Sequence, residues 1–176
     1  IKWETSTTFD AGFELGLLED RIVTEFSYYN KRTKDVFMYL AVPPSFGYTN
    51  WWDNVGEILN WGVELNVTSH NLTKKLKWDT KVNLAYNYNE IVSIGDYSPD
   101  AVSGGTNDTR VVPGSPVGTN FLVRFSHVDQ ATGQPVYLDI NGEETYTWSP
   151  ADRVPVGDIL PDLVGGITNS FKYKKW

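Results

Sequence analysis

Cysteine is absent from the 176 residues, and histidine occurs only twice, at His70 and His127. Without cysteine the chain forms neither a disulfide framework nor a thiol nucleophile. Two histidines are too few for a zinc site of the usual ligand spacing. Lysine and arginine number 15 against 22 acidic residues, which gives a net charge of −7. This lacks the basic excess of a general nucleic-acid binder. We therefore expect no metal, no cofactor and no nucleic-acid partner.

The chain also lacks long apolar runs and recognisable catalytic motifs. No stretch reaches the roughly 18 consecutive apolar residues of a transmembrane helix, and no signal peptide is visible. No nucleophile-elbow motif is present. The carboxylates of the later loops, such as Asp139 and Glu143, lack the spacing of an EF-hand and are expected to be solvated. We expect a protein that is not an enzyme.

Aromatic residues are abundant, at 14% of the chain, and they include seven Trp and ten Tyr. Rings with one polar atom favour a boundary between apolar and wet surroundings. Membrane-spanning barrels carry such rings in girdles at both interfaces. Soluble sugar-binding sandwiches are also rich in Trp, so composition alone leaves both classes open.

Apolar and polar side chains alternate with a period of two through several long segments. Phe13 and Leu15 alternate with Glu14 and Gly16, for example. This period is typical of a strand with one apolar and one polar face. It predicts five strands, near residues 2–17, 21–37, 55–67, 76–88 and from 163 onward.

The connections between these strands alternate in length. Residues 18–21 and 70–75 form short turns, whereas residues 38–54 and 93–162 form long loops rich in turn-forming residues. Within the second loop, residues 121–125 and 135–140 are predicted to pair as a hairpin about a turn at 131–134. Short turns alternating with long loops are the pattern of an up-and-down spanning barrel. The predicted fold is all-β: a segment of an antiparallel up-and-down transmembrane β-barrel with long extracellular loops, and a single domain over residues 1–176.

A secreted soluble β-sandwich that binds carbohydrate is the alternative, because sandwich strands also alternate. The predicted strands reach 13 or more residues, which is long for a sandwich and suits a tilted membrane crossing. In a barrel, one set of side chains faces lipid and the other faces the lumen. The lipid-facing set is Phe13, Leu15, Val63, Leu65, Val82 and Leu84, and the lumen-facing set is Glu14, Glu64, Lys81 and Asn83.

Tyr48, Trp51 and Trp52 are the candidate substrate-binding residues. They lie in the first long loop, which is predicted to be extracellular. Aromatic faces stack on sugar rings and hold peptide side chains, but they also pack loop on loop or against a partner protein. Both interpretations stay open at the level of sequence.

Six groups of residues resemble, in order, the SusC/RagA type of TonB-dependent transporter. The first three are Lys2-Trp3-Glu4-Thr5 with Thr8-Phe9-Asp10-Ala11-Gly12, then Leu17-Leu18-Glu19-Asp20-Arg21, then Ser27-Tyr28-Tyr29-Asn30-Lys31-Arg32-Thr33-Lys34-Asp35. The others are Asn54-Val55-Gly56-Glu57 with Asn60-Trp61-Gly62-Val63-Glu64-Leu65, then Gly133-Gln134-Pro135-Val136-Tyr137-Leu138-Asp139, and finally Gly157-Asp158 with Pro161-Asp162 and Gly165-Gly166-Ile167-Thr168-Asn169-Ser170-Phe171-Lys172-Tyr173-Lys174. Each group alone is a weak signal, and the ordered set covers nearly the whole chain.

This resemblance implies a fragment of the C-terminal part of an outer-membrane barrel in a Gram-negative bacterium. Proteins of this family import oligosaccharides or peptides with a SusD-like surface lipoprotein as partner. They draw energy from TonB, through a part of the protein that we do not expect in these residues, and no plug domain is expected here either. About five strands cannot close a barrel of the roughly 22 strands typical of such transporters.

Overall fold

The computed structural model describes residues 1–99, 101–103 and 109–174. Strands dominate these ranges, and the helical elements described in them are two 3-10 turns, η1 (Pro44–Phe46) and η2 (Pro150–Asp152). No helix in the described ranges has both the length and the apolar character needed to cross a membrane.

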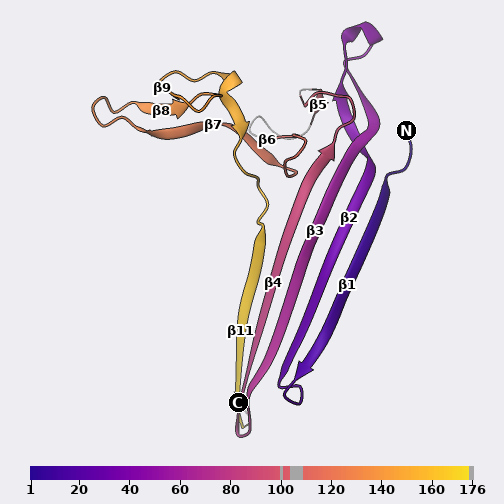
Figure 1. The fold of residues 1–176 in the computed structure, drawn as a ribbon, viewed down its shortest axis with the longest axis vertical. Coiled ribbons are helices and arrows are strands. Elements are labelled where there is room, and N and C mark those ends of the chain that lie inside the picture. The colour runs from indigo at the N-terminus through magenta and orange to yellow at the C-terminus, as the bar shows by residue number, and fades with distance from the viewer. Residues whose placement is uncertain (100, 104–108, 175–176) are drawn as a thin grey trace. The chain divides into compact units, whose positions relative to one another are not determined.

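Five long strands form one sheet (Figure 1). They are β1 (Thr5–Leu17), β2 (Ile22–Ala41), β3 (Asn50–Thr73), β4 (Leu76–Ser93) and β11 (Leu163–Tyr173). They lie in the order β1-β2-β3-β4-β11, so each long strand pairs with the next long strand along the chain. A long connection separates β4 from β11 in the sequence. β11 is antiparallel to β4, with Leu163 opposite Tyr86 and Tyr173 opposite Leu76. The five predicted strands and their up-and-down order are confirmed.

The connections differ from the prediction in length. β1 and β2 are joined by a tight turn in which Leu18, Glu19 and Asp20 all have positive φ. β3 runs to Thr73, so the second turn is residues 74–75 and not 70–75. The first long loop is also shorter than predicted, because β2 continues to Ala41 and β3 already begins at Asn50.

The second long connection contains a sheet of its own. The predicted hairpin is confirmed as β7 (Thr119–Val128) paired antiparallel with β8 (Pro135–Leu138). The sequence did not predict four short strands of two or three residues, which are β5 (Val102–Ser103), β6 (Thr109–Arg110), β9 (Glu144–Thr145) and β10 (Arg153–Pro155). β6 and β10 pair with β7, and β9 pairs with β8, whereas β5 pairs with β2.

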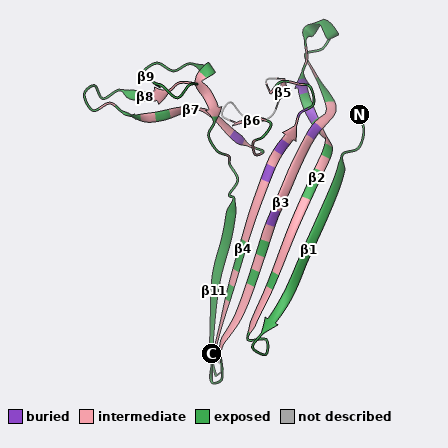
Figure 2. Cartoon of the chain, viewed as in Figure 1, coloured by how far each residue is buried: buried purple, intermediate pink, exposed green. Residues whose placement is uncertain are grey.

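The described residues divide into two compact units. The first, the loop unit, comprises residues 1–5, 34–58 and 90–160, and the second, the wall unit, comprises residues 6–33, 59–89 and 161–176. Strands β2, β3 and β4 each run from one unit into the other. The buried hydrophobic side chains all lie in the loop unit, and they are Met38, Leu40, Ile91, Ile94, Val102 and Val136. In the wall unit β1 and β11 are exposed along their described length (Figure 2).

Candidate functional site

One face of the wall unit is a continuous apolar surface, which we call the apolar face. Rings from neighbouring strands meet on it: Phe13 stacks on Phe26 with centroids 5.4 Å apart, and Trp78 stacks on Phe171 at 5.6 Å. On the edge strands the side chains of this face are exposed, at 58% for Phe13 and 71% for Ile167, and on the central strands they are half-buried, as at Trp61 and Val82. The wall unit has no buried hydrophobic residue among those described, so nothing within the unit covers this face. A sheet in water would have to bury such a face.

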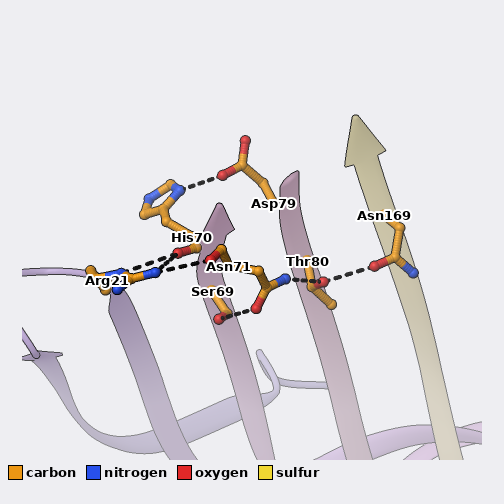
Figure 3. Close-up of polar contacts among 7 residues, drawn as sticks. All are labelled: Arg21, Ser69, His70, Asn71, Asp79, Thr80 and Asn169. Carbon is orange, nitrogen blue, oxygen red and sulfur yellow. Dashed lines mark hydrogen bonds and ion pairs between the residues drawn. The ribbon is translucent and has the colours of Figure 1, made fainter. Parts of the chain in front are cut away.

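A row of polar side chains interrupts the apolar face near the short turns (Figure 3). Ser69 Oγ donates to Asn71 Oδ1 (2.9 Å), Asn71 Nδ2 donates to Thr80 Oγ1 (2.7 Å), and Thr80 Oγ1 donates to Asn169 Oδ1 (2.7 Å). The indole Nε1 of Trp78 donates to the same Asn169 oxygen at 3.0 Å. We call these five residues the polar belt. Such a belt suits the level at which an apolar layer gives way to water.

The opposite, polar face of the wall unit carries the residues that the sequence placed there. Alternation along the strands puts Glu14, Glu64, Lys81 and Asn83 away from the apolar rings. Near the turns, His70 Nδ1 lies 2.6 Å from Asp79 Oδ1 (Figure 3). The structure therefore confirms the division into two faces, and the contact of one face with lipid stays a prediction.

A brace on the polar face spans three strands. The hydroxyl of Tyr29 on β2 donates to Asn87 Oδ1 on β4. Its ring passes over Gly62 on the intervening β3, where an added Cβ would lie 2.7 Å from the ring and would overlap the backbone oxygen of Tyr86. Only glycine leaves room for the ring at this position, because a side chain would have to displace both groups.

The candidate substrate-binding aromatics lie in the loop unit and form two groups. Tyr48 lies in the connection and stacks on Trp51 at 6.1 Å. Trp52 instead stacks on Phe37 (4.9 Å, 12° between planes) and lies tilted against Tyr39 (4.9 Å, 44°), both on β2. The loop placement predicted for Trp51 and Trp52 is wrong, because both residues belong to β3. Adjacent residues on a strand point to opposite faces, which separates Trp51 from Trp52. Contact of Tyr48, Trp51 and Trp52 with substrate stays a prediction.

The sequence analysis missed the core of the loop unit. Met38 and Leu40 on β2 pack with Ile91, Ile94 and Val102. The first two were assigned to a loop, and the last three flank or lie in the long connection, in which only the hairpin of residues 121–140 was predicted. Every position from Val36 to Leu40 is apolar, so the sequence shows no alternation there, and the only signal of a core was this apolar run.

The strands β6 to β10 form the sheet of the second long connection, which we call the loop sheet. Its carboxylates stabilise turns. Asp129 accepts hydrogen bonds from the Ala131 amide, the Thr132 hydroxyl and the Tyr146 hydroxyl, each at 2.8 Å. These donors lower the pKa of Asp129 to about 2, the Ala131 amide most, and the same carboxylate raises the pKa of Tyr146. Asp139 accepts from the amides of Asn141 and Glu143, and the Glu143 amide is the main cause of its lowered pKa.

Asp129 and Asp139 therefore accept hydrogen bonds from backbone amides of their own turns. Among the described residues no group of three or more His, Asp or Glu side chains lies close enough together to hold a metal ion. Asp139, which begins the stretch that resembles a calcium loop in sequence, has its Oδ1 engaged by two amides of its own turn.

Comparison with known proteins gives a consistent result. A family model described as TonB-dependent receptor-like β-barrel matches residues 1–163. A TonB-dependent receptor of Formosa agariphila is 29% identical over 99% of the chain and 19% of its own length. The TonB-dependent receptor SusC of Bacteroides thetaiotaomicron is 28% identical over 100% of the chain and 19% of its own length. The chain thus spans about a fifth of the length of the curated relatives it matches.

Solved structures share the fold. The structure of the RagAB peptide transporter superposes with a TM-score of 0.83 at 21% identity, over 99% of this chain and 20% of that one. The RagAB peptide importer in its open-open state gives a TM-score of 0.85 at 21% identity, over 99% and 19%. The long strands and the loop sheet together therefore match one segment of a much longer chain.

Proposed function

The chain belongs to the TonB-dependent receptor-like β-barrel family, and from this premise we propose that it forms part of the wall of an outer-membrane importer of nutrients. Members of the family are outer-membrane β-barrels of Gram-negative bacteria. In this proposal all of residues 1–176 belong to one barrel domain. The short turns lie on the periplasmic side, and the connections within 38–54 and 93–162 lie outside the cell. The protein acts by transport and not by catalysis.

The uncovered apolar face is the observation that carries this proposal. β1 has 13 residues and β11 has 11, and a tilted strand needs about 9–11 to cross a bilayer. A soluble β-sandwich would pack a second sheet on the apolar face and bury side chains such as Phe13 and Ile167. Lipid chains cover such a face without a second protein layer.

We infer the substrate class and the partners from the relatives. SusC and the RagAB peptide transporter are the similar proteins that point to them. The substrate is an oligosaccharide or a peptide, and a SusD-like surface lipoprotein binds on the outer side. TonB supplies the energy through a part of the protein outside this chain. Tyr48, Trp51 and Trp52 are all exposed and suited to contact substrate, and Trp52 presents its ring together with Phe37 and Tyr39.

A growth experiment tests the import function. The gene for the whole protein is deleted, and cells are grown on a panel of oligosaccharides or on a tryptic peptide digest as sole carbon source. We expect loss of growth on one of these classes, restored by the gene, with the same loss in a strain without TonB. Growth on a monosaccharide or on free amino acids is the control and stays unchanged. Unaltered growth on the whole panel in both mutants would contradict the proposal.

A protease experiment tests the topology. A protease added to intact cells should cut the whole protein within residues 93–162, because this connection lies outside the cell. The turn at residues 18–21 should stay intact until the outer membrane is opened. Cleavage of that turn in intact cells would place the short turns on the outside and overturn the proposed orientation.

A further inference from the structure

An open hollow lies beside the β3–β4 turn of the wall unit. It has a volume of about 560 Å³ and is lined by Arg21, Asn71, Leu72, Thr73, Lys74, Lys75 and Leu76. Lys74 and Lys75 form the two-residue turn, and both residues are exposed. Three cations and no carboxylate therefore line this hollow.

Arg21 is held in place at the hollow (Figure 3). Its guanidinium donates to the backbone oxygen of Asn71 at 2.9 Å and to that of His70 at 3.3 Å. These acceptors are neutral, so they orient the guanidinium without cancelling its charge. A positioned guanidinium together with two mobile ammonium groups is a donor set for a phosphate group.

Further positive charge gathers at the same end of the sheet. Lys77 and Lys172 lie directly opposite each other on β4 and β11, on the polar face with Asp79, so they add to the positive potential of this end of the sheet without touching a ligand on the apolar face. Like charges at directly paired positions are destabilising unless an anion lies near them. The nearest carboxylate along β4, Asp79, is already paired with His70. Glu19 and Asp20, in the β1–β2 turn next to Arg21, are also acidic groups at this end, and Arg21 with the four lysines outnumbers these carboxylates.

The hollow also lies where apolar and polar surfaces meet. Leu72 and Leu76, on either side of the turn, are 44% and 40% exposed. Asn71 is shared between the hollow and the polar belt, which ends the apolar face. Trp78 on that belt donates to Asn169, so its polar atom is satisfied at the same level. A ligand here would have to be amphipathic, with an anionic head and an apolar body.

We propose that this hollow binds the phosphodiester head group of an anionic phospholipid in the periplasmic leaflet of the outer membrane. The proposal rests on the membrane placement proposed above. Arg21 and the two lysines contact the phosphate, and Leu76, on the apolar face with Trp78, contacts the glycerol and the first methylenes of the acyl chains. Each lysine or arginine near an anionic lipid surface strengthens the binding of the protein to that lipid by about five-fold at moderate ionic strength.

Native mass spectrometry of the whole protein tests this site. The protein is released from nanodiscs of phosphatidylglycerol and phosphatidylcholine, and retained lipids are counted. We expect retained phosphatidylglycerol, and the double variant Lys74→Gln with Lys75→Gln should weaken its binding about 20-fold. The matched control, Lys31→Gln with Lys81→Gln, removes two charges from the polar face away from the hollow and should leave retention unchanged.

The arms of the experiment separate the alternatives. Equal retention by the Lys74/Lys75 variant, or equal retention of both lipids, would overturn the lipid site. Binding of inorganic phosphate that depends on Lys74 and Lys75, with no phosphatidylglycerol retained, would show a site for free phosphate and would overturn the lipid site as well. The fraction of wild-type protein in the outer membrane is measured in parallel. A protein absent from that membrane would contradict the proposed function, whereas correct localisation with equal lipid retention would contradict only this inference.

Discussion

Gly62 shows how a single residue can hold three strands together. The Tyr29 ring crosses β3 only because Gly62 has no side chain, and its hydroxyl then reaches Asn87 on β4. Glycine in a strand weakens the strand by itself, so its presence marks a close approach of neighbouring groups. The brace offsets this weakness by fixing the ring over the vacant position.

We expect Gly62→Ala to destabilise the folded barrel by about 1–3 kcal/mol, which is typical of overpacking. The new methyl group would meet the Tyr86 backbone oxygen, and backbone cannot move aside cheaply. The measurement is the urea concentration at which half of the whole protein is unfolded. Unfolding is monitored by the loss of the heat-modifiable band on gels. Gly166→Ala is the matched control, since its methyl group would meet mainly the end of the Asn83 side chain. Equal midpoints for both variants would rule out the brace.

Asp129 gives the loop sheet a dependence on pH. Its folded pKa of about 2 lies below the ordinary value of about 3.9. The ionised carboxylate therefore stabilises the turn fully above pH 4, and this stabilisation is lost as the pH falls through 2. Pepsin should cut near Ala131 much faster at pH 2 than at pH 4 after correction for its own activity. Pepsin should cut the Asp129→Asn variant at pH 4 as fast as it cuts the wild type at pH 2. A cleavage rate of the variant at pH 4 equal to that of the wild type at pH 4 would contradict this role.

At the scale of elements, the apolar face predicts opposite responses at adjacent positions of β3. Leu65→Arg places a charge on the apolar face, and at mid-membrane this costs about 2–4 kcal/mol. Asn66→Arg places the same side chain on the polar face, where Asn66 already contacts Glu25. We expect the first variant to reduce the folded protein in the outer membrane and the second to leave it near the wild-type amount. Equal tolerance at both positions would indicate that the face is not in lipid.

The five long strands were predictable because their alternation persists for many residues. The prediction failed at the end of β2, where Asp35 adopts a positive φ of 58°. The rings of the apolar face lie at even positions before Asp35, as at Phe26, whereas the first stacked ring after it lies at an odd position, Phe37. Beyond Asp35 both faces are apolar, because Met38 packs in the core while Phe37 stacks on Trp52. Such a segment has no visible period, so it was taken for a loop.

The candidate aromatic site was only partly predictable for a related reason. Composition and position singled out Tyr48, Trp51 and Trp52, but adjacent residues on a strand cannot share a face. Their separation into two groups depends on where β3 begins, and that boundary is invisible to periodicity. β5, β6, β9 and β10 have two or three residues each, which is too short for any periodic signal.

At the scale of the whole molecule, the wall unit is an incomplete structure by itself. β1 and β11 each pair with one neighbour among the described strands, so both leave an edge of backbone donors and acceptors. Open edges promote aggregation in water and are not tolerated in lipid. Residues 1–176 expressed alone without detergent should therefore be insoluble or oligomeric on size-exclusion chromatography. A monodisperse monomer that melts cooperatively in plain buffer would support a soluble sandwich instead.

The placement of the apolar face in the bilayer is the central claim, and spin labels on β4 test it most directly. Residues 1–176 have no cysteine, so single labels can be attached at Lys81, Val82, Asn83 and Leu84 of the whole protein in lipid bilayers, after any cysteine elsewhere in that protein is replaced by serine. Collision with oxygen, which concentrates in lipid, is compared with collision with a water-soluble nickel complex. We predict high oxygen accessibility at Val82 and Leu84 and low oxygen accessibility at Lys81 and Asn83. Accessibility without alternation, or nickel access at Val82, would contradict the account.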